Sequence, residues 1–356
     1  MSTGPQSGLF RRTLGGVQQV AGWVASLLPD RDQRLVWQEF RNKARAFDLF
    51  ANLESALDLQ PSRSYSAGEL VDKVLQKDPY ESPWIMEGVG HYLADRHRDA
   101  SQPLFSGSLA ARCLVPLHVG MGLSFANRVL GSLSSESPEA RVREAVDTFI
   151  GQCHNTAQPG FEPVAHEGLG LVARNVYPRL VRAVARAAAE IRPGIEEYFW
   201  HGVGRGLYFL PANAMPSSCA PWIAIDAAQK ESPHPVARRN MLAGLAWALI
   251  LVNLQHPEIP ALFLKHHGDV LCPDNIFRNG ITSAMRIWLA CSPEDPAPKR
   301  LIGYRPDPSD RDLCRLWAEQ VVEPCEEMIR RGGPAPDEPT PLPQVFHYIS
   351  EPPYAR

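Results

Sequence analysis

Several polar residues stand beside glycine pairs in this chain, and they are the first candidates for chemistry. Glu87 directly precedes Gly88, and His201 directly precedes its own pair. His118 and His166 each stand two residues before a pair. Imidazole and carboxylate groups are common general acids and bases. If the segments are repeats around one axis, equivalent positions face that axis, so we expect these side chains to converge on one cavity.

The strongest acid/base candidate is a stripe on one predicted helix. Glu87, His91 and Asp95 are spaced i, i+4 and i+8, so they share one face of a helix over residues 84–98. A buried carboxylate could orient the His91 imidazole and tune it as an acid or base. A solvated helix face shows the same spacing, and this alternative stays open. The catalytic candidates are Glu87, His91, His118, His166 and His201.

A metal centre is a further interpretation of the histidines. Three convergent imidazoles could bind Zn or Fe, and they could equally hydrogen-bond helix ends. His166 and Glu167 begin like an HExxH motif, but Gly170 stands where the second histidine belongs. We therefore assign no metal ligands, and the sequence leaves any cofactor unknown.

Gly-x-Gly segments open four predicted apolar helices, and they are the main internal repeat. Glycine inside a helix costs about 1 kcal/mol relative to alanine, so matched pairs need a structural reason. One reason is close helix packing, and the other is room for a ligand in a central cavity. No strand precedes any pair and GxGxxG is absent, which argues against a dinucleotide fold. The pairs are Gly88 and Gly90, Gly120 and Gly122, Gly168 and Gly170, and Gly202 and Gly204.

Helical periodicity dominates the rest of the chain. Residues 33–58, 138–150, 171–191, 236–254 and 311–331 predict helices, and strand alternation is scarce. The first glycines of the four pairs and of two weaker relatives are 32 to 48 residues apart, the length of a helix pair with its loops. We expect an all-α fold of repeated helical hairpins, and closure into an α/α toroid stays an open alternative.

The ends of the chain differ from its middle. We expect an N-terminal helical extension over 1–60, a helical-repeat domain over 61–331 and a proline-rich irregular tail over 332–356. Arg11 and Arg12 precede an apolar stretch, loosely like a twin-arginine export signal. Gln18 and Gln19 interrupt that stretch, so an amphipathic first helix is the expected structure.

Composition limits the class of protein. The 36 basic and 39 acidic residues give a net charge of −3, which argues against a nucleic-acid partner. No run of 18 apolar residues occurs, so we expect no membrane span. Seven cysteines without a CxxC pair favour a reduced, cytoplasmic protein without disulfides.

Four motifs carry a family resemblance. They are Met86-Glu87-Gly88, His118-Val119-Gly120-Met121-Gly122 leading to Arg128, Gly168-Leu169-Gly170-Leu171, and Gly202-Val203-Gly204-Arg205-Gly206-Leu207-Tyr208-Phe209. In these the chain resembles a bacterial family of unknown function found among the accessory genes of enediyne polyketide clusters. The similarity covers roughly residues 45–290, while the loop from 213 to 235 and the C-terminal tail have no counterpart. It implies a biosynthetic context and leaves the reaction open.

Two hypotheses for function follow. In the first, the chain is an accessory protein of enediyne or polyketide-type metabolism that holds an apolar polyene or polyketide intermediate in a helical cavity. Cyclisation or isomerisation by Glu87 and His91 is its sharpest version, with other pathway proteins as further partners. In the second, the chain is a non-catalytic helical-repeat scaffold that binds protein partners. Whether it is an enzyme stays open at this point.

Overall fold

The computed structural model describes residues 30–60, 63–97, 102–105, 109–210, 220–332 and 342–350, and all its regular elements are helices. The expected all-α class is thereby confirmed. The amphipathic helix predicted before Pro29 lies outside the described residues.

The helices are α2 (Arg31–Ala51), α3 (Leu53–Ala56), α4 (Ala67–Val74), α5 (Ser82–Arg96), α6 (Ala111–Leu130), α7 (Glu139–Thr156), α8 (Glu162–Val176), η1 (Pro178–Leu180), α9 (Val181–Ile191), α10 (Ile195–Tyr208), α12 (Ala220–Glu231), α13 (Pro235–Val252), α14 (Glu258–Leu271), η2 (Pro273–Asn275), α15 (Ile276–Cys291), α16 (Ala297–Gly303), α17 (Arg311–Trp317), the π-helical η3 (Ala318–Val322), α18 (Glu323–Arg330) and η4 (Pro343–Phe346).

Local signals fix several helix ends. Ser66 and Glu69 form a reciprocal capping box that starts α4. α10 begins after Gly194, whose φ of 92° is a left-handed conformation that suits glycine. α13 begins with Pro235, whose missing N–H is no loss in the first turn of a helix. These helices therefore begin at residues whose local sequence favours a helix start.

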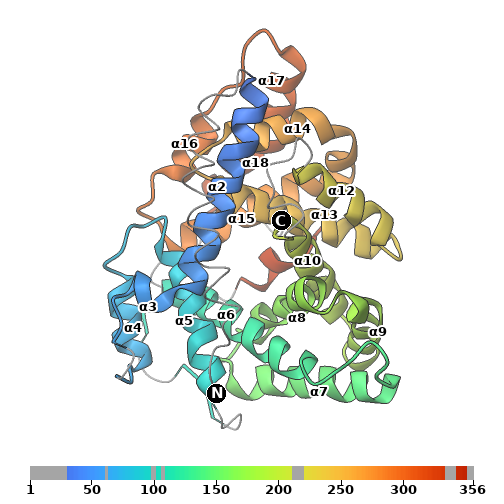
Figure 1. The fold of residues 1–356 in the computed structure, drawn as a ribbon. Helices are drawn as coiled ribbons and strands as arrows, with labels where there is room; N and C mark the ends of the chain where they lie inside the picture. Colours follow the sequence, from blue (N-terminus) through green and yellow to red (C-terminus); the bar gives the residue numbers. More distant parts are fainter. Residues whose placement is uncertain are drawn as a thin grey trace.

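Six helices form the core and pack against one another in chain order: α5, α6, α8, α10, α13 and α15. The ends of this series also meet, because Trp288 of α15 lies 6.0 Å from Trp84 of α5 between ring centroids. Figure 1 shows α7 and α9 side by side on the outside of the lower half of the molecule. The first and last helices of the series are therefore also in contact.

The glycine pairs lie where these core helices touch. A Cβ atom on Gly120 would overlap the backbone carbonyl of Glu87, and one on Gly204 would overlap that of Met241. The other six glycines of the four pairs meet the backbone of a neighbouring helix in the same way. The weaker relative Gly244 also meets backbone, that of His201. Close packing is thus the direct structural role of these glycines.

Segments near both ends of the described part of the chain pack on the other helices. α2 packs on α5, α13 and α14, and Figure 1 shows it, in blue, running along one side of the molecule. The described part of the tail is irregular apart from η4, which lies centrally against α8, α10 and α15. Leu342, Val345 and Phe346 are buried there, and the Tyr348 backbone N–H donates to Asn240 Oδ1 at 2.7 Å. The tail is therefore docked into the helical domain.

Two helices, α6 and α13, are long and apolar enough to cross a membrane by length and composition alone. Within the structure, 89% and 78% of their apolar windows are buried by other helices. Such burial is what the central helices of a soluble protein show.

The glycine contacts predict opposite effects of one substitution at two sites. Gly204→Ala should lower the free energy of unfolding by about 1–3 kcal/mol or more, because Met241 backbone occupies the space of the new methyl group. Gly151→Ala is the matched control: Gly151 lies inside α7 with open space around it, so the change should raise stability by up to about 1 kcal/mol. Urea unfolding measures both, and equal stability of the two variants would contradict the packing.

Candidate functional site

A buried ion-pair cluster lies at the centre of the core helices. Nη2 of Arg205, on α10, donates to Oε1 of Glu87 on α5 at 2.6 Å. Nη1 of Arg205 donates to Oε2 of Glu167 on α8 at 3.0 Å. His201 Nδ1 lies 2.9 Å from the other oxygen of Glu167. We call these four residues the Arg205 cluster; all are buried.

The glycine contacts place the members of this cluster. Glu87, Glu167 and His201 each directly precede the first glycine of a pair, and Arg205 lies one helical turn after His201. A Cβ atom on Gly202 would overlap the Glu167 carbonyl oxygen, so α8 and α10 are in backbone contact at this level. One guanidinium on α10 thus reaches a carboxylate on the neighbouring α8 and a second carboxylate on α5.

The cluster has one permanent cation for two carboxylates, and burial separates their properties. Burial raises the pKa of Glu87, and the nearby charge of Glu167 adds to this, although Arg205 opposes it. Burial also pushes the pKa of Glu167 upward, but Arg205 and His201 together outweigh burial and lower that pKa. Two carboxyl groups whose environments move their pKa values apart are suited to different roles. Glu87 is the member suited to holding a proton.

Glu87 borders two hollows. The first, which we call the apolar pocket, has a volume of about 120 Å³. The second, which we call the small pocket, has a volume of about 30 Å³. Trp84 and Glu87 line both, and the Glu87 side chain is 11% exposed. The apolar pocket is lined by Ala46, Phe47, Phe50, Trp84, Glu87, Leu123, Leu171, Asn175, Arg205 and Phe209. The small pocket is lined by Pro83, Trp84, Glu87, Pro116, Val119, Trp247, Leu251, Ile287, Trp288 and Cys291.

Corresponding positions of the Gly-x-Gly segments recur in these linings. Three residues after the first glycine of a segment come Leu123, Leu171 and Arg205 in the apolar pocket and Trp247 in the small pocket. One residue before it come Glu87 and Val119. These two positions are one helical turn apart, so a single face of each core helix points inward. Of the residues expected to converge on one cavity, Glu87 lines both pockets, whereas His118, His166 and His201 line neither.

The remaining histidines lie apart from the Arg205 cluster. His118 hydrogen-bonds to the Leu114 carbonyl, accepts from the Gln158 backbone N–H and stacks on Phe161. His166 packs beside Phe149 and Tyr198. The three imidazoles therefore do not share neighbours, and His201 alone belongs to the cluster. No group of three or more metal-ligating side chains occurs among the described residues.

Burial also decides the charge of these two histidines. It lowers the pKa of His118 to about 4 and that of His166 to about 4. Both imidazoles are then neutral at pH 7. Their contacts give them a structural role, in which a ring nitrogen of His118 connects α6 to the loop before α8.

His91 does not take the place that the i, i+4 spacing predicted. Its ring packs edge-on against Phe50 at 5.6 Å between centroids, and burial lowers its pKa. Glu87 is directed to Arg205 instead, and Asp95 is exposed. Glu87, His91 and Asp95 do lie on one helix, α5, but the partner of the Glu87 carboxylate is Arg205 on α10.

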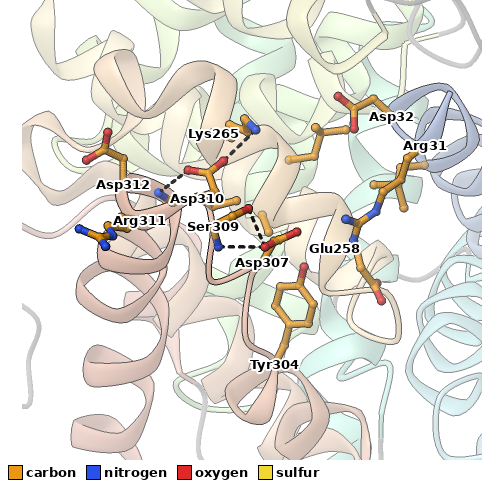
Figure 2. A pocket seen from close by; sticks show the side chains of 14 residues that line it. Arg31, Asp32, Glu258, Lys265, Tyr304, Asp307, Ser309, Asp310, Arg311 and Asp312 are labelled. Atoms are coloured by element: carbon orange, nitrogen blue, oxygen red, sulfur yellow. Dashed lines mark hydrogen bonds and ion pairs between the residues drawn. The ribbon is translucent and has the colours of Figure 1, made fainter.

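A larger hollow lies elsewhere, between the starts of α2 and α17 and the side of α14. It has a volume of about 560 Å³ and is open and polar. Figure 2 shows contacts among its polar residues: Lys265 meets Asp310 at 2.8 Å, and Asp307 accepts from Ser309. Exposed pairs of this kind are common on protein surfaces and contribute little. The buried cluster is therefore the better candidate, despite its smaller cavities.

Sequence reasoning missed Glu167 and Arg205. Two signals were available: Glu precedes the first glycine in both the first and the third pair, and Arg205 stands inside an otherwise apolar helix. A buried arginine needs carboxylate partners, and Glu167 was an acidic residue to which no partner had been assigned from the sequence.

Comparisons with family models, curated proteins and solved structures give no match to this chain.

The cluster predicts a large stability loss when its cation is removed. Arg205→Met leaves two buried carboxylates without a counter-ion and should cost about 3–5 kcal/mol of unfolding free energy. Adding Glu87→Gln to that variant should restore part of the loss, because it removes one of the two charges. Arg141→Met, which breaks an exposed pair with Glu144, is the control and should change little. Urea unfolding tests all three, and an unaffected Arg205→Met variant would contradict the cluster.

The raised pKa of Glu87 predicts a pH dependence with a definite sign. A carboxyl with a folded pKa above its unfolded value, about 4.3, contributes stability that is complete below the unfolded pKa. That contribution is lost as the pH rises through the folded pKa. The stability of Glu87→Gln relative to wild type should therefore rise as the pH increases from about 4 toward neutrality. Urea unfolding across this range measures it; a constant difference would mean an unshifted Glu87.

Proposed function

We propose that this chain is an accessory protein of specialised metabolism that binds an apolar polyene or polyketide intermediate in the apolar pocket. In this proposal Glu87 exchanges a proton with the bound ligand, and the reaction is an isomerisation or a cyclisation. The observation that carries it is a carboxyl group with a raised pKa that borders an apolar cavity. The resemblance to the enediyne-associated family supplies the ligand class.

The cost of the Arg205 cluster supports a functional role. Replacing a buried ion pair with well-packed apolar residues is often neutral or stabilising, so such a cluster is poorly explained by stability alone. Perturbed titratable groups in a hollow are typical of functional sites. Arg205 lines the apolar pocket beside Glu87, so it can hold the carboxyl group in place while a proton moves.

The size of the apolar pocket limits how the ligand binds. A dry cavity of about 150 Å³ accommodates benzene, so about 120 Å³ holds a short segment of a chain. A longer polyene would place one end in the pocket and leave through its opening, where Phe47 of α2 is 51% exposed. The proposed ligand is therefore linear, with one end beside Glu87.

A cytoplasmic location belongs to the same proposal. The six cysteines among the described residues are all free, as in a reduced compartment. Cys219 lies outside the described residues. Pathway proteins remain the proposed further partners, since large exposed apolar side chains occur on several helices, including Phe47 of α2 and Val176 of α8.

Binding can be tested with 2,4,6-octatriene, a linear polyene without polar atoms. Saturation-transfer NMR should detect binding to the wild-type protein, because the pocket lining is mostly apolar. Leu171→Trp should abolish the signal by filling the pocket. Leu133→Trp, at a half-buried position outside both pockets, is the control and should leave it intact. Absence of binding, or equal binding by the two variants, would refute the proposed ligand site.

The role of Glu87 can be tested in the organism that carries the gene. A deletion strain complemented with Glu87→Gln should accumulate an unprocessed pathway intermediate, because glutamine cannot exchange the proton. His91→Ala is the comparison, since His91 packs on Phe50 and does not line either pocket. We expect it to complement. Full complementation by Glu87→Gln would refute the proposed proton exchange, and ligand binding without catalysis by Glu87 would be the function that remains.

A further inference from the structure

Two tryptophan N–H groups beside Glu87 have no hydrogen-bond acceptor. Nε1 of Trp84 and Nε1 of Trp247 are shielded from solvent, and no acceptor lies within hydrogen-bond distance of either among the described residues. The third tryptophan of the small pocket, Trp288, donates instead to Asp295 Oδ2 at 2.8 Å. A buried donor without a partner costs about 1–3 kcal/mol, so two such donors at one hollow call for an explanation.

A third unpaired donor lies in the same region. Nε of Arg205 also lacks an acceptor among the described residues, although both of its terminal nitrogens are bonded to carboxylates. Arg205 packs over the Trp247 ring, with 5.2 Å from guanidinium carbon to ring centroid. Trp84 and Arg205 both line the apolar pocket, and Trp84 and Trp247 both line the small pocket. The residues that carry these unpaired donors therefore each line one or both of the hollows, and Trp84, like Glu87, lines both.

The two hollows differ in a way that fits one ligand. A cavity needs about 10–15 Å³ of water-probe volume to hold one water molecule, so the small pocket, at about 30 Å³, has room for a group as small as a carbonyl oxygen. The apolar pocket holds a short hydrocarbon segment. Trp84 and Glu87 line both hollows, so a ligand that reached from one into the other would lie beside these two residues.

We propose that the junction of the two pockets is a binding site for the carbonyl oxygen of a conjugated apolar ligand, which accepts hydrogen bonds from the indole N–H groups of Trp84 and Trp247. The hydrocarbon part of this unsaturated ketone or acyl chain lies in the apolar pocket. This inference rests on the proposed function and names the functional group that the ligand must carry.

Charge selects a neutral oxygen over a carboxylate. Arg205 is the one permanent cation of its cluster, and it already faces Glu87 and Glu167. A ligand carboxylate would bring a third acidic group to the same place without a further cation. A carbonyl oxygen satisfies indole donors without adding charge, and its dipole is stabilised by the same N–H groups.

A pair of small probes of equal shape tests the site. 3-Penten-2-one carries the carbonyl, and 2-methyl-1,3-pentadiene replaces its oxygen with a methylene group. Dissociation constants come from saturation-transfer NMR titrations. For each protein, the dissociation constant of 2-methyl-1,3-pentadiene is divided by that of 3-penten-2-one. Comparing this ratio between proteins cancels the difference in hydration between the two probes. The double variant Trp84→Phe/Trp247→Phe removes both N–H groups and keeps aromatic rings in place.

The ratio should fall about tenfold in the double variant, as the loss of one to two hydrogen bonds implies. Trp317→Phe is the control: Trp317 is buried with an unpaired Nε1 but lines neither pocket, so the ratio should stay unchanged. Each single variant should show a partial effect, which keeps the test open if the double variant does not fold.

The outcomes separate this inference from the proposed function. If both probes bind and the ratio is the same in all proteins, a water molecule satisfies the donors and the carbonyl site is refuted, while the apolar pocket stands. If neither probe binds, the proposed function fails together with the inference. Tighter binding of 2-pentenoate than of 3-penten-2-one would refute the preference for a neutral oxygen.

Discussion

One guanidinium between two carboxylates is the interaction on which the interior of this protein depends. Arg205 is fully enclosed, so its charge is tolerable only because Glu87 and Glu167 reach it from two other helices. That geometry requires side chains from α5, α8 and α10 to reach the same level of the core. The burial of this charge thus constrains how these helices are placed, and the Glu87 carboxyl group lies next to the two pockets.

The glycine pairs make this constraint possible. Each pair removes side chains from a helix contact, so backbones approach to a distance at which a Cβ atom would overlap a carbonyl oxygen. At these two positions, the residue before the first glycine and the residue one turn later, Glu87, Val119, Leu123, Leu171 and Arg205 line the pockets. Packing and cavity lining, which looked like alternative roles for glycine, are consequences of one arrangement: the glycines make the contacts, and their neighbours in sequence line the space between the helices.

A second polar network connects α2 to this core. Asn42 donates to Asn253 Oδ1 at 2.9 Å, and Asn253 donates to the Tyr208 hydroxyl at 2.9 Å, while Lys43 pairs with Glu39 at 3.0 Å. The same helix contributes Phe47 and Phe50 to the apolar pocket. The extension expected from the sequence is thus a wall of the proposed site, and specific hydrogen bonds hold it in register along the core helices.

The sequence by itself determined the helical class, the glycine pairs and the candidacy of Glu87 and His201, because helical periodicity and residue spacing act over a few turns of one chain segment. Only the tertiary structure decided the partners. Glu87 pairs with Arg205, 118 residues away, rather than with His91 on its own helix. His118 belongs to a separate hydrogen-bonded site, and His166 packs among aromatic rings. Spacing within a helix states which residues share a face. It carries no information on which distant helix supplies the counter-charge, since that depends on how closely the helices pack and on the need of every buried charge for a partner.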